Sequence, residues 1–345
     1  MRVLLVTPGP QFSVADVARG WGRALTDLGV DLQTCDMSSY LWFYSNAEVP
    51  KDDEKIRAFD WGQAVVEAGE RMKGQAFTWW PDVVIVISGF FARPFLIDLF
   101  RARGMTTVLI CTESPYQDQQ QLEWAEHYDV TILNDPTNIG MFESRCRNVF
   151  YAGHSYDPRV HHPGPAIESL RSDVCMVGTG YPSRIGWLER VDWSGVDLRL
   201  GGNWKGLADH PLRAYCPAGE LDQCLDNDET ADWYRSTQVG LNLYRKEADE
   251  GSTAFGYSMG PREIELAACG TFYMTEARPE NRELLPFVPV VESPEQFRED
   301  LGWWLDRPQK RADIAQKARE MLAGWTFENR ARTLLGLLDR QPVTL

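Results

Sequence analysis

Short apolar segments that alternate with amphipathic ones are the feature that most constrains the fold of this chain. The first pair is an apolar run at Val3–Val6 and, after a turn rich in proline and glycine, an amphipathic segment at Val14–Leu28 that Gly29 closes. This pattern predicts a strand, a loop and a helix. Repeated along a chain, it predicts parallel sheets that helices cover on both faces.

The same alternation continues through both halves of the sequence. In the first half, further strands are predicted at Val83–Ile87, Thr107–Cys111 and Val130–Leu133, and helices at Asp53–Lys73, Pro94–Arg103, Gln119–Glu126 and Asn138–Glu143. In the second half, strands are predicted at Val174–Val177, Asp197–Leu200, Val239–Leu243, Thr271–Met274 and Val288–Val291. The predicted helices of that half are Ser183–Val191, Thr230–Ser236, Arg262–Cys269, Pro294–Leu305, Pro308–Leu322 and Phe327–Asp339. Two doubly wound α/β units in series follow from this order.

The alternation stops between about residues 153 and 172, where Pro158, Pro163, Gly164 and Pro165 punctuate polar sequence. A chain of 345 residues is long enough for two domains of about 100–200 residues each. We therefore expect a Rossmann-like domain at residues 1–155, a linker at 156–172, a second Rossmann-like domain at 173–325 and a terminal helix at 326–345. Two such domains leave room for a ligand cleft between them.

Charge and composition exclude several classes of protein. The formal net charge of −15 argues against nonspecific nucleic-acid binding, because it repels a phosphate backbone. A nucleotide ligand stays possible, since one diphosphate needs only one or two cations and a few N–H groups. The seven cysteines include no C-x-x-C pair, and of the five histidines only His161 and His162 are adjacent while the other three are scattered. We therefore expect no metal site.

No segment predicts a membrane or secretory location. The most apolar stretch, residues 83–100, is interrupted by Gly89, Arg93, Pro94 and Asp98, so it is not a spanning helix of about 20 apolar residues. The chain begins with Arg2 and a short apolar run rather than a secretory signal. The expected location is the cytoplasm.

The most specific motif is Gly260-Pro261-Arg262-Glu263-Ile264-Glu265, which continues to Ala-Cys-Gly. Helix-forming residues begin just after Gly260-Pro261, so the first free N–H groups of a helix lie beside the Arg262 guanidinium, and both suit a diphosphate. Glu265, one turn further, suits two neighbouring ribose hydroxyls. The alternative is a capped surface helix whose charges are solvated.

Two other loops follow predicted strands and carry suitable groups. Gly178-Thr179-Gly180 lets a ligand approach the backbone closely, and Arg184 adds a positive charge. Trp204 and Lys205, after another strand, are a candidate stacking surface and a candidate cation. The alternatives are a tight turn that binds nothing at 178–180, and core packing for Trp204.

These motifs resemble the retaining-type GT-B glycosyltransferases, and most closely the CgeB-like branch, the spore-maturation or Glycos_transf_1_2-type proteins. The likeness covers most of the C-terminal half, through the Val288–Val291 strand and the Pro294 helix beyond it. It extends to the 177–184 turn and, more weakly, to residues 112–116. It implies a GT-B fold, with Gly178–Gly180 facing the donor diphosphate, Glu265 on the donor ribose, and Asn242 and Arg245 near the sugar.

The resemblance also implies that the terminal helix crosses back onto the N-terminal domain. It has one departure: many relatives carry a glutamate eight residues before the ribose-binding one, where this chain has Tyr257. A contact to the donor sugar and the stereochemical outcome therefore stay open. For Arg245, pairing with an acidic neighbour in the 246–250 run is the alternative.

Two residues are candidates for taking the acceptor proton if the reaction inverts the anomeric centre. Glu113 lies just past the Thr107–Cys111 strand, and His154 lies near the predicted linker. A helix N-terminal or hinge contact is the alternative for Glu113, and an interdomain hydrogen bond is the alternative for His154. A retaining reaction demands no protein base, because the departing phosphate accepts the proton while arginine and helix dipoles stabilise its charge. Such a reaction uses no metal and no cofactor beside the donor.

The sequence thus predicts a transferase that moves a sugar from a nucleoside-diphosphate sugar to an acceptor. A sugar-nucleotide epimerase of the same architecture and a nucleotide- or sugar-binding protein without turnover are the alternatives. The acceptor stays open among protein, glycan, lipid, small molecule and nucleic acid, although the acidic net charge disfavours a DNA-modifying transferase. The nucleobase (UDP, GDP or TDP) and the oligomeric state stay open as well.

Overall fold

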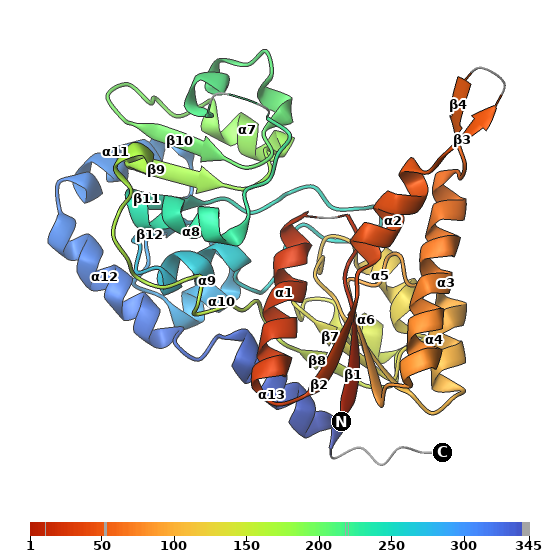
Figure 1. Cartoon of the computed structure of the whole chain (residues 1–345). Helices are drawn as coiled ribbons and strands as arrows, with labels where there is room; N and C mark the ends of the chain where they lie inside the picture. The colour runs from red at the N-terminus through yellow and green to blue at the C-terminus, as the bar shows by residue number, and fades with distance from the viewer. Residues whose placement is uncertain (11, 52–53, 218, 220, 340–345) are drawn as a thin grey trace. The chain divides into compact units, whose positions relative to one another are not determined.

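The structure is a computed structural model that describes residues 1–10, 12–51, 54–217, 219 and 221–339 (Figure 1). Its contacts divide the chain into two compact units. Unit 1 contains residues 1–152 and 249–253 and, from residue 330, the end of the chain. Unit 2 contains residues 153–248 and 254–329. Each unit has its own apolar core.

Unit 1 is built on a parallel sheet of six strands in the order β2-β1-β5-β6-β7-β8. The strands are β1 (Arg2–Val6), β2 (Asp31–Cys35), β5 (Val83–Ile87), β6 (Thr106–Ile110), β7 (Val130–Leu133) and β8 (Val149–Tyr151). The helices are α1 (Phe12–Asp27), α2 (Met37–Asn46), α3 (Trp61–Trp79), α4 (Pro94–Arg101), α5 (Asp118–Ala125) and α6 (Ile139–Glu143). In Figure 1, α1 lies on one side of this sheet and α3 and α4 on the other. Because both faces are covered, β5 is buried along its whole length.

The predicted helix Asp53–Lys73 is wrong at its start. Strands β3 (Glu48–Lys51) and β4 (Glu54–Arg57) pair as an antiparallel hairpin there. Helix α3 begins only at Trp61, because the Asp60 carboxylate accepts the Gln63 N–H at 2.7 Å and the Gln63 side chain accepts the Asp60 N–H at 2.9 Å. Residue 53 lies outside the described residues.

Unit 2 is built on a parallel sheet of four strands in the order β10-β9-β11-β12. The strands are β9 (Ser172–Val177), β10 (Leu198–Gly201), β11 (Thr237–Asn242) and β12 (Tyr273–Thr275). The helices are α7 (Pro182–Leu188), α8 (Asn227–Ser236), α9 (Pro261–Ala268), α10 (Pro279–Leu284), α11 (Pro294–Leu305) and α12 (Pro308–Met321). Short 3₁₀ turns are η1 (Glu168–Leu170), η2 (Lys205–Leu207) and η3 (Pro211–Tyr215). The predicted strand Val288–Val291 is reduced to one bridge between Val290 and Thr275.

The two units confirm the predicted α/β class with two Rossmann-like sheets. Residues 156–172, which we expected to form a linker, group with unit 2, where Tyr156 and Val160 are buried in the core. The last helix, α13 (Phe327–Leu338), contributes residues to both units. Over the described ranges, no helix is both long and apolar enough to cross a bilayer.

Strand order fixes where a ligand can reach each sheet. In unit 1, β1 has β2 on one side and β5 on the other, and in unit 2, β9 has β10 on one side and β11 on the other. The loops that leave such neighbouring strands diverge, which opens a crevice at the carboxyl ends of the strands. From the strand order we therefore expect the ligand crevice of unit 2 where β9 and β11 end.

Candidate functional site in unit 2

Arg262 joins the ends of the two strands that define this crevice. It is the second residue of α9, and its Nε donates to the carbonyl of Val177, the last residue of β9. Its Nη1 lies 3.3 Å from Oδ1 of Asn242, the last residue of β11. Asn242 is fully buried, and its amide donates to Thr275 Oγ1 at 3.0 Å. The Asn242 side chain thus holds the guanidinium in place rather than facing solvent.

The glycine at position 178 is required by this arrangement. A Cβ on Gly178 would collide with the Arg262 guanidinium, whose Nη2 is the nearest atom. The Gly178 N–H donates to the Gly201 carbonyl at 2.8 Å, and a Cβ on Gly202 would lie 2.6 Å from the Gly178 carbonyl oxygen. Glycine therefore lets the two loops and the guanidinium pack against one another.

Arg184 lies at the same strand ends but is committed to the protein. Its side chain is 5% exposed, its Nε donates to the Leu243 carbonyl at 2.9 Å and its Nη1 donates to the Thr179 carbonyl at 2.9 Å. We expected Arg184 to contact the diphosphate. The structure instead shows it joining the loop after β9, through the Thr179 carbonyl, to the end of β11, through the Leu243 carbonyl.

A third guanidinium, that of Arg245, faces the same aromatic ring as Arg184. The Cζ atoms of Arg184 and Arg245 lie 5.2 and 5.0 Å from the centroid of the Tyr181 ring. Arg245 is half-buried, and its Nε donates to the Glu247 carbonyl at 2.6 Å. The structure thus brings the predicted residues of 178–184, 242–245 and 262 together around the ends of β9 and β11.

Glu265 follows Arg262 by one turn of α9 and is half-buried. Tyr234 Oη donates to Glu265 Oε2 at 3.3 Å, and no other side chain among the described residues donates to this carboxylate. Nearby, His161 is 2% exposed and neither ring nitrogen has a hydrogen-bond partner among the described residues. Burial lowers the His161 pKa, while the charge of Glu265 acts in the opposite direction. Sequence reasoning found Glu265 but missed Tyr234 and His161, which no local motif marks.

The structure does not offer Trp204 as a stacking surface. Its side chain is fully buried in the core of unit 2, and its Nε1 donates to the Gly201 carbonyl at 2.8 Å. The ring also fills the space beside Gly180, where a Cβ would collide with it. The core-packing alternative is the one observed, because a large apolar ring gains more from burial than from exposure in a loop. Lys205, the next residue, is exposed.

A buried carboxyl, Glu263, fixes the start of α9 and was missed as a site residue. It accepts from Tyr244 Oη, from Asn281 Nδ2 at 3.1 Å and from the Gly260 N–H at 3.4 Å. Burial raises the pKa of Glu263 to about 7, although these hydrogen bonds act to lower it. A glutamate at the third helical position is the sequence signal of such a cap. The cap orients the turn that carries Arg262 and Glu265.

The catalytic candidates belong to different units. In unit 1, Glu113 is half-buried and follows β6. The next residue, Ser114, is held by Asn134, whose Oδ1 accepts the Ser114 N–H at 3.1 Å and whose Nδ2 donates to the Ser114 carbonyl at 2.8 Å. The Ser114 hydroxyl also donates to the buried carboxylate of Asp118. His154 is half-buried near the start of unit 2.

No cluster of three or more histidine, cysteine, aspartate or glutamate side chains suited to a metal ion occurs among the described residues. The positive groups that the structure gathers at the strand ends of unit 2 are guanidinium groups.

Comparison with known proteins gives a consistent result for the fold. Sucrose-phosphate synthase from Thermosynechococcus elongatus is 12% identical, with 99% of this chain and 98% of that chain covered and a TM-score of 0.65. The E. coli trehalose-6-phosphate structure bound with UDP-2-fluoro glucose is 13% identical, with coverage of 99% and 100% and a TM-score of 0.63. A putative UDP-N-acetylglucosamine 2-epimerase from Listeria monocytogenes is 10% identical, with coverage of 98% and 95% and a TM-score of 0.63.

At the level of sequence, residues 184–336 match the family model Glyco_trans_1_2, described as Glycosyl transferase-like. No curated protein sequence gives a significant match. The matched segment contains Asn242, Arg262 and Glu265. The CgeB-like branch stays a prediction. The chain has the two-domain, Rossmann-like GT-B fold, and its residues 184–336 match the glycosyl transferase-like family.

Proposed function

We propose that the protein is a glycosyltransferase that takes a sugar from a nucleoside-diphosphate sugar bound at the ends of β9 and β11. The observation that carries the proposal is the position of Arg262, whose guanidinium lies against Gly178 at the switch point of the unit 2 sheet. The match of residues 184–336 to a glycosyl transferase-like family supports it. So does the similarity in fold to a structure that holds UDP-2-fluoro glucose.

Each group at the crevice has a role in this proposal. Arg262 pairs with the diphosphate through Nη2, and the N–H groups of Thr179 and of the start of α9 add partial positive charge. The Gly178 and Gly180 N–H groups instead hold the loop, by donating to the Gly201 and Asn203 carbonyls. Glu265 accepts hydrogen bonds from the two ribose hydroxyls. Arg245 and Lys205 add positive charge near the sugar and the phosphates, and Gly260 and Asn242 position Arg262. Arg184 acts by holding the loop that contacts the phosphates.

The reaction forms a bond between the acceptor oxygen and the anomeric carbon and breaks the bond between that carbon and the phosphate oxygen. The electron pair of the broken bond leaves with the nucleoside diphosphate, whose developing charge the guanidinium groups stabilise. The acceptor proton passes to Glu113 or His154 if the centre is inverted, or to the departing diphosphate if it is retained. The configuration of the product, read by NMR, separates the two routes.

Donor binding tests the proposal directly. A thermal-shift panel of UDP, GDP, TDP and their sugars identifies the nucleotide, and titration of the variants follows. We expect Glu265→Gln and Arg262→Ala to weaken nucleotide binding by roughly 10- to 100-fold, the effect of about 1.5–3 kcal/mol for a hydrogen bond to a charged group. Arg190→Ala is the matched control, because Arg190 is an exposed arginine of unit 2 that pairs with Glu295 at 3.0 Å.

Three results would count against the proposal. Unchanged nucleotide affinity in both variants would show that the nucleotide does not bind at the proposed site. Glu265→Gln keeps the size of the side chain, so this variant is expected to fold even if Arg262→Ala does not. The similarity to a putative epimerase favours one alternative function. Incubation of the sugar nucleotide with protein and no acceptor distinguishes it, since an epimer forms only if that alternative is correct. Tight donor binding without release of nucleoside diphosphate to any acceptor indicates a binding protein.

A further inference from the structure

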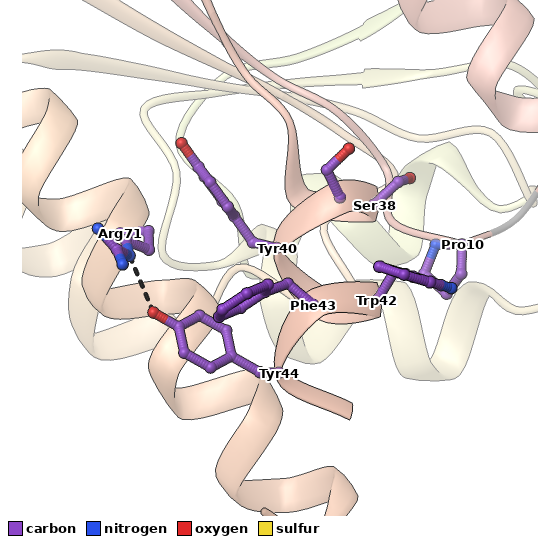
Figure 2. Close-up of a pocket in the computed structure, with 8 residues that line it drawn as sticks. Pro10, Ser38, Tyr40, Trp42, Phe43, Tyr44 and Arg71 are labelled. Carbon is purple, nitrogen blue, oxygen red and sulfur yellow. Dashed lines mark hydrogen bonds between the residues drawn. The ribbon is translucent and has the colours of Figure 1, made fainter. Parts of the chain in front are cut away.

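Unit 1 contains an aromatic pocket of about 810 Å³ that the proposed donor site does not use (Figure 2). Helix α2 supplies Tyr40, Trp42, Phe43 and Tyr44 to its lining, and α3 supplies Arg71. In Figure 2, Trp42 and Pro10 lie at one end of the pocket, and Arg71 lies with Tyr44 at the other. Helix α2 directly follows β2, and Pro10 follows β1, so the pocket lies at the carboxyl ends of the unit 1 strands.

The loop after β1 is fixed against α2, so this pocket is a built feature. The Met37 N–H donates to Thr7 Oγ1 at 2.9 Å, and the Ser38 hydroxyl donates to the Gly9 carbonyl. Gly9 has φ +95°, and a Cβ there would collide with Phe91. Only glycine combines that backbone conformation with this close packing.

The walls of the pocket are large aromatic side chains left open to solvent. Trp42 is 69% exposed and Phe43 is 56% exposed, although they are neighbours on one helix. Exposed apolar groups gathered at one place mark a binding site more often than scattered ones do. The volume lies within the range of about 300–1,000 Å³ that is typical of pockets for small molecules. A stable protein partner would need about 20–30 residues on this side, whereas eight residues line the pocket.

Arg71 gives the pocket a charged end. Its Nε donates to Tyr44 Oη at 2.8 Å. Among the described residues, the two Nη atoms of Arg71 donate to no protein acceptor. The hydrogen bond to Tyr44, and to a smaller extent the charge of Glu67 one turn earlier on α3, raise the pKa of Arg71, so the guanidinium keeps its charge.

We propose that this pocket binds the acceptor, and that the acceptor is a small molecule with a flat apolar body and an anionic group. The body stacks on Trp42 and Phe43, and the anion pairs with Arg71. The assignment of the ligand as the acceptor rests on the proposed function. A carbohydrate acceptor fits less well, because the Ser38 hydroxyl already donates to the Gly9 carbonyl and the Ser39 hydroxyl to the Asp36 carboxylate, so neither serine is left to donate to a sugar hydroxyl.

A matched pair of fluorescent probes tests the pocket in the full-length protein. The probes are 7-hydroxycoumarin-3-carboxylate and 7-hydroxycoumarin, which share a flat body and a hydroxyl but differ in the carboxylate. Their anisotropy is titrated with wild type, Trp42→Ala, Arg71→Gln and, as a control, Trp303→Ala, which removes an exposed tryptophan from α11 of unit 2. We expect saturable 1:1 binding by wild type and by the control.

The variants should separate the two ends of the pocket. Trp42→Ala should weaken both probes about tenfold, since an aromatic pair contributes beyond its buried area. Arg71→Gln should weaken the carboxylate probe about tenfold and leave 7-hydroxycoumarin unchanged. Equal binding by wild type and Trp42→Ala overturns the inference, as does wild type that binds neither probe. Binding of glucose 6-phosphate in place of the coumarins, or self-association that Trp42→Ala abolishes, overturns it as well.

Nucleotide binding keeps this test separate from that of the proposed function. A Trp42→Ala protein that retains its thermal shift with nucleoside diphosphate, yet loses the coumarins, supports the pocket as an independent site. Coumarin binding at Trp42 in a protein that binds no nucleoside diphosphate leaves the ligand class correct and refutes the sugar-transfer proposal. Normal nucleotide binding with coumarin affinities that no pocket variant changes refutes the pocket and leaves the donor site intact.

Discussion

Arg262 and Arg184 lie at the same pair of strand ends, yet they differ in what they can still bind. Arg184 is buried and donates to two carbonyls, whereas Arg262 is half-buried and keeps Nη2 beside Gly178. The sequence predicts a phosphate contact for both, because it identifies the charge of a side chain but not the carbonyls that distant segments place around it. Trp204 shows the same difference, since its burial depends on packing that no local pattern records.

Glu263 should make stability depend on pH. Its folded pKa of about 7 exceeds the ordinary 4.5, so the folded state binds more protons and this group's contribution falls as pH rises from about 4.5 to 7. Glu263→Gln does not titrate, so its stability relative to wild type should rise by about 3 kcal/mol between pH 4.5 and 8. Urea unfolding at several pH values measures this. Glu299→Gln, which alters an exposed carboxyl on α11, is the control. If the unfolding free energies of wild type and Glu263→Gln change in parallel with pH, the prediction is contradicted.

His161 should make stability depend on pH in the opposite direction. Burial lowers its folded pKa, so the unfolded chain takes up a proton near pH 6.5 while the folded one does not, and stability falls as pH drops below that value. Asp157 and Glu265 oppose this effect, and Arg235 adds to it. His161→Leu should lose less stability than wild type between pH 7 and 5, measured by urea unfolding. His162→Leu, which alters an exposed neighbour, should show the same change in unfolding free energy with pH as wild type. If His161→Leu shows the same change as well, the imidazole of His161 is not buried in its neutral form.

Strands and helices with a strong hydrophobic pattern could be predicted from the sequence, and those with a weak pattern could not. The predicted strands 83–87 and 174–177 coincide with or lie within β5 and β9, because buried parallel strands are continuously apolar. The pattern predicts neither β2 nor α2: β2 is an edge strand with polar residues, and α2 carries aromatic residues without a clear apolar face. Since α2 forms the aromatic pocket, the sequence could not predict that pocket, whereas the loops after β9 and β11 could be named from their glycines and arginine.

The loop after β9 should tolerate no side chain at its first glycine. Gly178→Ala places a Cβ against the Arg262 guanidinium and displaces it from Val177 and Asn242. We expect nucleotide affinity to fall at least about tenfold, the scale of one lost charged hydrogen bond. Calorimetric titration measures it. Gly186→Ala, within α7 and with no close neighbour at the Cβ position, should bind normally. Full affinity in Gly178→Ala would show that Arg262 does not hold the nucleotide where we place it.

At the scale of the whole molecule, each unit has its own sheet and its own core, so each can respond to a ligand separately. The proposed nucleotide groups, Arg262, Glu265 and the 178–180 loop, all belong to unit 2. The aromatic pocket belongs to unit 1. A ligand stabilises the part of a protein whose folded form it binds, and at 100 times its Kd it adds about 2.7 kcal/mol.

Hydrogen exchange should therefore assign each ligand to one unit. With the nucleoside diphosphate of highest affinity at 100 times its Kd, amides of β9, β11 and α9 that exchange through unfolding of unit 2 should slow by about 100-fold. Amides of β1, β5 and α2 should keep their rates, and 7-hydroxycoumarin-3-carboxylate should reverse the pattern. Slowing in both units with either ligand would mean that they unfold together. Slowing by the nucleotide in unit 1 alone would move the donor site to the other sheet, because only binding there can protect those amides.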